Sequence, residues 1–274
     1  MIARCYKRLA NVAWVVITVM IAAFLVVPTL SVFPMSFSPG STFQLVPEEI
    51  SFRWYENFFA DDRWLSAVWN SLGVAIAVTA IATVFGTMAA IGIHGMPGRI
   101  AGVVRQLLML PLVAPGIVIA VVVYMTYLRQ GMVGSYLGFV LIHSAMAIPF
   151  VLVAVTSSLA SFDGQVLKAA RTLGSPPLRA ALRVQLPMIA PGVLSGAVFA
   201  FVTSLDEVVV ALFIRSATFE TLPVRMFNSV TVEIDPTVAA ASSMLVVLAT
   251  LVIVVPRLTA LGIKYARRRS VSGR

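Results

Sequence analysis

Residues 130–162 read QGMVGSYLGFVLIHSAMAIPFVLVAVTSSLASF, without one Asp, Glu, Lys or Arg. A helix needs roughly 20 apolar residues to cross the hydrocarbon layer of a bilayer, so this stretch is long enough to span it. Five further stretches are equally free of charge, and the shortest, 236–256, still reaches that length: 9–47, 64–98, 106–128, 184–205 and 236–256. The pattern predicts six membrane-spanning helices.

The composition excludes the other broad classes of protein. Of the 274 residues, 59% are hydrophobic and 11% are charged, whereas about 25% are charged in soluble domains. A membrane β-barrel would show alternation over segments of about 10 residues instead of continuous apolar runs. We therefore expect an all-α membrane protein. We expect residues 1–274 to form a single transmembrane domain, with spans at about 10–30, 66–93, 104–127, 137–159, 188–213 and 238–261.

The basic residues predict the orientation of the chain. Six spans place both termini on one side of the membrane, and all but five of the 20 Lys and Arg residues flank that side; the five are Arg53, Arg63, Arg129, Arg215 and Arg225. The positive-inside rule then places the N- and C-termini in the cytoplasm. The net charge of +9 is explained by this sorting and by contacts with anionic membrane lipids. A nucleic-acid partner is not expected, because no basic domain exists to bind one.

The longest predicted cytoplasmic connection, residues 160–187, has the pattern of a bent pair of helices. Asp163 is placed to cap a first helix over 166–173. Gly174 follows as a residue that can adopt a positive φ and so end that helix. We call residues 160–187 the elbow.

A second helix of the elbow is predicted to begin just after this glycine. Ser175 can cap it, and Pro176 suits its first position, where a missing N–H costs nothing. Pro187 is expected to end this helix before the fifth span begins. A helix, a tight turn and a helix outside the bilayer suggest a rigid unit that transmits force.

Two nine-residue segments of the chain resemble one another. Residues 110–118 read LPLVAPGIV and residues 186–194 read LPMIAPGVL, with identical Leu, Pro, Ala, Pro and Gly positions. We call them the first and second Pro-Gly segments. Each lacks two backbone N–H donors, so both are expected to bend or break their helices where these enter the membrane from the cytoplasm.

The elbow resembles the EAA loop of ABC-importer permeases, Glu-Ala-Ala-x3-Gly-x9-Ile-x-Leu-Pro. The matching residues are Lys168, Ala169, Ala170, Gly174, Val184, Leu186 and Pro187, at identical spacing. Flanking resemblances lie at 54–55 and 69–72, at 110–115 and at 201–207. Over about residues 50–255 the chain looks like the second permease subunit of spermidine/putrescine-type importers.

The resemblance implies a type I ABC importer transmembrane fold, in which the elbow is a coupling helix seated in a groove of a cytoplasmic ATPase. The residues that it assigns to ATPase coupling are Lys168, Ala169, Ala170, Gly174, Leu186 and Pro187. Two positions depart from the motif, since Lys168 replaces Glu and Val184 replaces Ile. The lysine reverses a charge, which bears on the choice of ATPase partner. The alternative interpretation of the elbow is an ordinary amphipathic loop helix.

The energy for transport is expected to come from other subunits. A phosphate-binding P-loop requires Gly-Lys-Ser/Thr, but Lys7, Lys168 and Lys264 follow Tyr, Leu and Ile. The chain therefore has no expected catalytic residue or cofactor. The implied partners are two ATPase subunits, a second permease subunit and an extracytoplasmic solute-binding protein in a bacterial inner membrane. The resemblance implies that the chain forms half of a pathway for polyamines or a related small solute, with opines and phosphonates as open alternatives.

Asp206 and Glu207 are the carboxylates within the predicted spans. Asp206 lies about 27 Å from the cytoplasmic start of its span. Intramembrane carboxylates are costly unless they face protein or water, so these two residues are candidates for the path of a cationic substrate. The alternative is an interfacial carboxylate or one paired with Arg215.

Two further hypotheses concern metals and the energy source. His94 and His143 have no Cys or acidic residue at ligand spacing, so no metal site is expected. The chief alternative function is an ion-gradient-driven secondary transporter of a small cationic solute. Such a protein would need midplane charges and an inverted repeat, and the sequence shows neither clearly.

Overall fold

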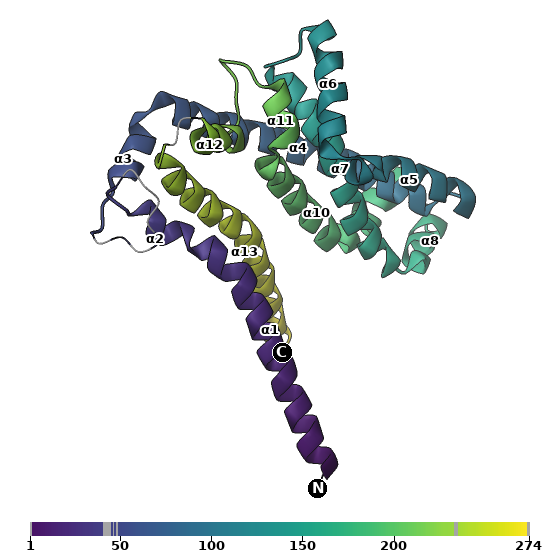
Figure 1. Cartoon of the computed structure of the whole chain (residues 1–274). Helices are drawn as coiled ribbons and strands as arrows, with labels where there is room; N and C mark the ends of the chain where they lie inside the picture. The colour runs from purple at the N-terminus through teal and green to yellow at the C-terminus, as the bar shows by residue number, and fades with distance from the viewer. Residues whose placement is uncertain (1, 41–44, 46, 48, 233–234, 273–274) are drawn as a thin grey trace. The chain divides into compact units, whose positions relative to one another are not determined.

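The computed structural model describes the chain except for residues 1, 41–44, 46, 48, 233–234 and 273–274, and the described residues fold into helices and connecting turns (Figure 1). The elements are α1 (Ile2–Leu30), α2 (Val32–Ser36), α3 (Arg53–Ala60), α4 (Asp62–His94), α5 (Gly98–Val113), α6 (Gly116–Gln130), α7 (Tyr136–Ala160), α8 (Gly164–Thr172), α9 (Pro177–Ala180), a π-helical turn (Ala181–Gln185), α10 (Leu186–Asp206), α11 (Val209–Ile214), α12 (Leu222–Thr231) and α13 (Thr237–Ser272). The predicted all-α class is confirmed.

Within the described ranges, five helical stretches are long and apolar enough to cross a membrane: Asn11–Ser36, Asp62–His94, Tyr136–Ala160, Pro177–Asp206 and Thr237–Val255. A sixth crossing requires α5 and α6 together, which are bent by 94° at their junction. Helix α5 has 16 residues and helix α6 has 15. Each is therefore shorter than the roughly 20 residues that a membrane crossing needs. The predicted span 104–127 is therefore two helices.

The two Pro-Gly segments differ in structure. In the first, α5 ends at Val113, and Ala114 and Pro115 have extended backbones before α6 begins at Gly116. This break confirms the prediction for residues 110–118. In the second, α10 runs from Leu186 to Asp206 with Pro191 inside it. Of the bend or break predicted for residues 186–194, the break does not form.

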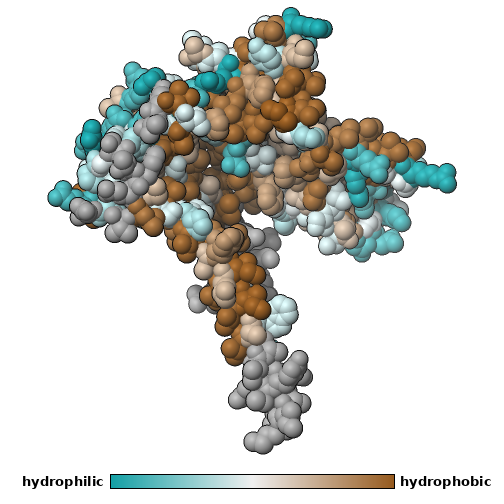
Figure 2. Space-filling view, in the orientation of Figure 1, coloured by the Kyte–Doolittle hydropathy of each residue, from teal (hydrophilic) through white to brown (hydrophobic). Residues whose placement is uncertain are grey.

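The chain forms two compact units, residues 1–62 with 228–274 and residues 63–227. In the first unit, α3 packs on α13. The Trp54 indole N–H donates to the Ser38 carbonyl at 2.8 Å, and the Tyr55 hydroxyl bonds to the hydroxyls of Ser36 and Ser243 at 2.7 and 2.8 Å. By contrast, α1 is exposed along Asn11–Leu30 and its surface there is mainly hydrophobic (Figure 2).

In the second unit, α7 is the central helix and packs most extensively on α10. Glycines permit the close approach around Val151 of α7. A Cβ at Gly86 of α4 would lie 2.7 Å from the Val151 Cβ, and one at Gly196 of α10 would lie 3.0 Å from the Val151 Cα. His143 of α7 is buried, and its Nδ1 lies 3.1 Å from the Ser204 Oγ of α10. The three helices therefore form a tight core.

Candidate functional site

The first helix of the elbow, α8, has an N-cap and lies on the surface of its unit. The Asp163 carboxylate accepts a hydrogen bond from the Gln165 N–H at 2.9 Å, so the predicted cap of α8 is confirmed. No residue of α8 is buried. The helix is thus held by its cap and its neighbours and leaves most of its side chains uncovered.

A glycine with a left-handed backbone conformation ends helix α8. Gly174 has a φ of +86°, as predicted. The Ser175 N–H donates to the Ala170 carbonyl at 3.1 Å and the Gly174 N–H to the Arg171 carbonyl at 3.0 Å, which is the paired bonding of a Schellman motif. A Cβ at Gly174 would meet nothing within 4 Å. The backbone conformation alone therefore requires glycine here.

The second helix of the elbow, α9, begins and ends at other residues than the sequence predicts. The helix α9 begins at Pro177, with Pro176 in the cap position, so Ser175 is not its cap. The Ser175 N–H serves the Schellman motif of the preceding helix instead. Pro187 does not end the helix either, because Pro177–Asp206 is one continuous helical stretch of 30 residues.

A π-helical turn explains how the helix continues through Pro187. At Ala181–Gln185 the bonding pattern widens, and the Leu186 N–H donates to the Ala181 carbonyl, five residues earlier. A π-turn shifts the hydrogen-bond register within an α-helix. Proline has no N–H to donate, and placing it directly after such a shift lets the helix resume without an α-type bond from residue 187. The second helix of the elbow and the fifth span are consequently one continuous helix.

The elbow exposes apolar and basic side chains together. Val166, Leu173, Leu178 and Leu182 are 40%, 88%, 72% and 54% exposed. The basic residues Lys168, Arg171, Arg179 and Arg183 are exposed as well. Of the remaining predicted coupling residues, Ala169 and Pro187 are exposed, and Ala170 and Leu186 are half-buried. Contiguous exposed apolar side chains mark surfaces that bind another protein or a membrane.

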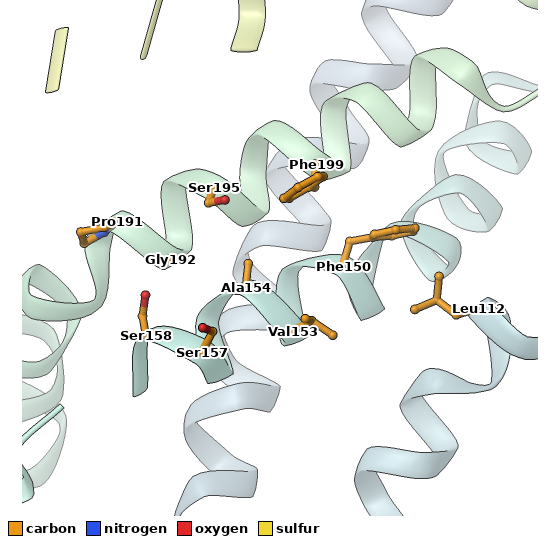
Figure 3. Close-up of a pocket in the computed structure, with 10 residues that line it drawn as sticks. All are labelled: Leu112, Phe150, Val153, Ala154, Ser157, Ser158, Pro191, Gly192, Ser195 and Phe199. Carbon is orange, nitrogen blue, oxygen red and sulfur yellow. The ribbon is translucent and has the colours of Figure 1, made fainter. Parts of the chain in front are cut away.

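A second feature is an open groove of about 630 Å³ between α7 and α10, which we call the α7–α10 groove. Figure 3 shows Phe150, Ser157 and Ser158 on α7 opposite Ser195 and Phe199 on α10. Leu112 of α5 completes one end. The lining contains no charged residue, and its polar side chains are three serine hydroxyls.

Gly192 permits the close packing of α10 on α7 along this groove. A Cβ at this position would overlap the Ser158 hydroxyl and would lie 2.8 Å from the Ala154 carbonyl oxygen. Real Cβ atoms essentially never lie within 3.0 Å of a neighbouring heavy atom, so any larger residue at position 192 would force α10 and α7 to shift. Leu112, Pro191 and Gly192 belong to the two Pro-Gly segments, but the spacing of the other lining residues shows no motif that could have predicted the groove.

The predicted substrate-path carboxylates lie where α10 ends. Asp206 is the last residue of α10 and is exposed. The Glu207 carboxylate accepts a hydrogen bond from the Val210 N–H at 2.9 Å and so caps the start of α11. Arg215 pairs with neither residue in the described structure. Its ion-pair partner is Glu220 at 3.7 Å, which corrects the alternative interpretation.

The known proteins that this chain resembles in sequence are inner-membrane permeases of transport systems. A sequence profile described as "Binding-protein-dependent transport system inner membrane component" matches residues 82–264. The spermidine/putrescine transport system permease protein PotC of Haemophilus influenzae is 30% identical over 236 residues, or 86% of this chain and 91% of that protein. The putrescine transport system permease protein PotI of Escherichia coli is 30% identical over 243 residues, or 84% of each chain.

Among solved structures, the fold is similar to that of a bacterial ABC transporter involved in the import of the acidic polysaccharide alginate. The TM-score is 0.68 at 17% identity, and the match covers 93% of this chain and 96% of that chain. At this identity the likeness concerns the fold alone. It agrees with the ABC-importer transmembrane fold that the EAA-like elbow implied.

Proposed function

Because the chain belongs to the family of binding-protein-dependent transport system inner membrane components, we propose that it forms half of the translocation pathway of an ATP-driven importer of polyamines. The chain is a permease subunit of an ABC importer and a multi-pass inner-membrane protein, without a catalytic role of its own. Membership in this family implies ATPase and solute-binding partners. A second permease subunit and two ATPase subunits complete the proposed complex.

The observation that supports coupling is the geometry of the elbow. The proposed ATPase contact consists of Lys168, Ala169, Ala170, Gly174, Leu186 and Pro187, on a surface where Leu173 and Leu178 are largely exposed. The continuous helix Pro177–Asp206 joins the second arm to the helix that carries Asp206. A displacement of the elbow would therefore move this helix as a lever, and that is how ATP-driven closure of the ATPases would switch the pathway.

Polyamines are the proposed substrates because two relatives at 30% identity are named for spermidine and putrescine transport. Asp206 adds a chemical reason. It is exposed at the end of α10, opposite the end that carries the elbow. If both termini lie in the cytoplasm, as the basic residues predict, this carboxylate faces the side from which a cationic substrate arrives.

The test is transport by the reconstituted complex. The chain is co-expressed with the second permease, ATPase and binding-protein subunits of its importer, and uptake of labelled spermidine into proteoliposomes is measured. We expect uptake that requires ATP and the binding protein and that persists with ionophores. Uptake driven by an ion gradient without ATP would contradict the proposed mechanism. ATP-driven uptake of a different solute in place of spermidine would contradict the polyamine assignment.

Gly174→Val tests the coupling role of the elbow. A left-handed backbone costs a residue with a side chain about 1–2 kcal/mol, so the elbow turn should open and reduce uptake about tenfold. Gly164→Val is the matched control, since Gly164 also has free space around it but no positive φ. Uptake and ATP hydrolysis are measured together. Equal effects of the two variants would contradict a requirement for this turn.

Asp206→Asn tests the substrate path. Loss of one exposed carboxylate weakens attraction of a polycation, so uptake at subsaturating spermidine should fall several-fold at low salt and less at high salt. Glu207→Gln is the comparison: its amide oxygen can still accept the Val210 N–H that the carboxylate binds, so a fall in uptake would report the lost charge of the second predicted path residue. Unchanged uptake kinetics for Asp206→Asn would remove this residue from the path.

A further inference from the structure

The elbow carries a one-sided charge that the fold itself does not use. Residues 160–187 contain four basic residues and one acid, Asp163. The Asp163 carboxylate already accepts the Gln165 N–H of the α8 cap. In the described structure no ion pair joins it to Lys168, Arg171, Arg179 or Arg183. The elbow therefore presents uncompensated positive charge.

On α8 this charge lies beside an apolar strip. Val166, Ala169 and Leu173 follow one another at the i, i+3, i+7 spacing of a helix face, and all three are exposed. Lys168 and Arg171, three residues apart, form an exposed basic strip next to it. The half-buried Leu167 and Ala170 occupy the remaining face. The helix thus offers a surface with one apolar edge and one cationic edge.

The second arm repeats this arrangement. Leu178 and Leu182 are four residues apart and exposed, and so are their neighbours Arg179 and Arg183. The same two chemistries therefore occur side by side on both helices of the elbow. A protein surface that covers the elbow must bury leucines and satisfy guanidinium and ammonium groups at the same time. Unpaired buried charges are strongly unfavourable.

We propose that the ATPase subunit that serves this chain receives α8 in a groove with one apolar wall and one acidic wall, in which an Asp or Glu side chain faces Lys168. The proposal rests on the proposed docking of the elbow on an ATPase and adds the chemistry of the partner. An ATPase groove suited to the Glu of the usual motif would place positive charge opposite Lys168. Like charges at an interface exclude a wrong partner, so the lysine restricts this permease to an acidic groove.

Anionic lipid headgroups are the other ligands that basic residues attract at an inner membrane surface. The pairing of each basic strip with exposed leucines at helix spacing favours a protein groove, since a headgroup layer has no apolar wall of matching shape. The two ligands also differ in a measurable way. A lipid contact should depend on the anionic lipid content of the membrane, whereas a contact with a carboxylate of the ATPase should not.

A zero-length cross-link tests the contact directly. A water-soluble carbodiimide joins a lysine ammonium to a carboxylate only where the two already touch, and the chain has three lysines, Lys7, Lys168 and Lys264. We expect mass spectrometry of the cross-linked complex to find Lys168 joined to an Asp or Glu of the ATPase. Lys168→Arg should abolish this product, because arginine keeps the positive charge but does not form the amide.

The functional test is reversal of the charge. Lys168→Glu should lower uptake about tenfold, the effect of a like-charge contact of roughly 1.4 kcal/mol, and the cross-linked carboxylate changed to Lys should restore it. Arg99→Glu is the control, an exposed basic residue of α5 outside the elbow, and should leave uptake unchanged. Normal uptake by Lys168→Glu, absence of the cross-link, or an effect that follows anionic lipid content would each overturn the proposal.

A separate measurement distinguishes failure of the acidic groove from failure of the coupling role of the elbow. Leu173→Cys, in a Cys5→Ser background that removes the one native cysteine, reports docking through a maleimide–benzophenone reagent, whose maleimide bonds to the cysteine thiol and whose benzophenone inserts on illumination into a C–H bond of any protein in contact. We expect a product with the ATPase. If this product forms while Lys168 joins no carboxylate, the acidic groove is wrong and the coupling role stands. If neither product forms, the coupling role is wrong as well.

Discussion

The first and second Pro-Gly segments share five of nine residues at identical positions, but only the first breaks its helix. Residues 110–118 lie at a 94° bend between α5 and α6. Residues 186–194 lie within a continuous α10. The local sequence is therefore insufficient to decide whether a proline-containing helix breaks.

The difference lies in what each segment packs against. No residue of 110–118 is buried, so nothing offsets the bias of Ala114 toward an extended backbone before Pro115. In 186–194, Ile189 and Gly192 are buried against the rest of the unit. In a membrane the buried isoleucine stabilises this packing through van der Waals contacts rather than through removal from water, and these contacts offset the cost of about 3 kcal/mol for an interior proline. Packing on α7 therefore keeps α10 helical.

The largest expected effect concerns Ile189 and its counterpart Val113. Ile189 is completely buried whereas Val113 is 79% exposed. Ile189→Ala should lower the free energy of unfolding by about 3 kcal/mol because it removes packed methyl groups and leaves a cavity. Val113→Ala should change it by less than about 0.5 kcal/mol. Unfolding in detergent measures both, and similar values for the two variants would contradict the role of packing.

A smaller effect is expected at the paired glycines. A Cβ at Gly192 would overlap Ser158, while one at Gly116 would lie 3.6 Å from the Val209 side chain, an ordinary contact. Gly192→Ala should cost about 1–3 kcal/mol through overpacking, and Gly116→Ala should be neutral. The melting temperature of the purified chain is the readout. If Gly116→Ala is the more harmful change, the close approach of α10 to α7 is not what holds the second segment.

The smallest effect on the free energy of unfolding is expected at Pro115 and Pro191, but replacing Pro115 should change the angle between α5 and α6. Pro115→Ala frees Ala114 to become helical, so labels at Val103 and Met125 should move apart from about 22 Å toward the roughly 33 Å of a straight helix. Pro191→Ala should leave the separation of labels at Leu182 and Phe199 unchanged, because α10 is already continuous. Pulsed spin-label distances measure both. An unchanged bend in Pro115→Ala would show that tertiary contacts set the 94° angle.

Features with a local physical cause were predictable from the sequence. The charge-free runs predict the membrane helices, because length and apolarity suffice for a crossing. Asp163 caps α8 and Gly174 has a positive φ, since both depend on the backbone of a few neighbouring residues.

Features that depend on distant residues were not predictable. The continuity of α10 through Pro187 depends on a π-turn and on packing against α7. The partner of Arg215 is Glu220, which the spacing of charges did not single out. Glu207 caps α11, a helix that begins at Val209, three residues after α10 ends at Asp206. No pattern in the sequence marks the side chains of the α7–α10 groove as neighbours.

The most direct test of the central claim is the accessibility of Leu173, the 88% exposed residue beside the elbow turn. Leu173→Cys in the Cys5→Ser background is treated with a membrane-impermeant maleimide in inside-out and right-side-out vesicles, with and without the ATPase subunits. We expect labelling from the cytoplasmic side that the ATPase subunits block. Labelling from the outer side, or labelling that the ATPase leaves unchanged, would contradict the coupling role of the elbow.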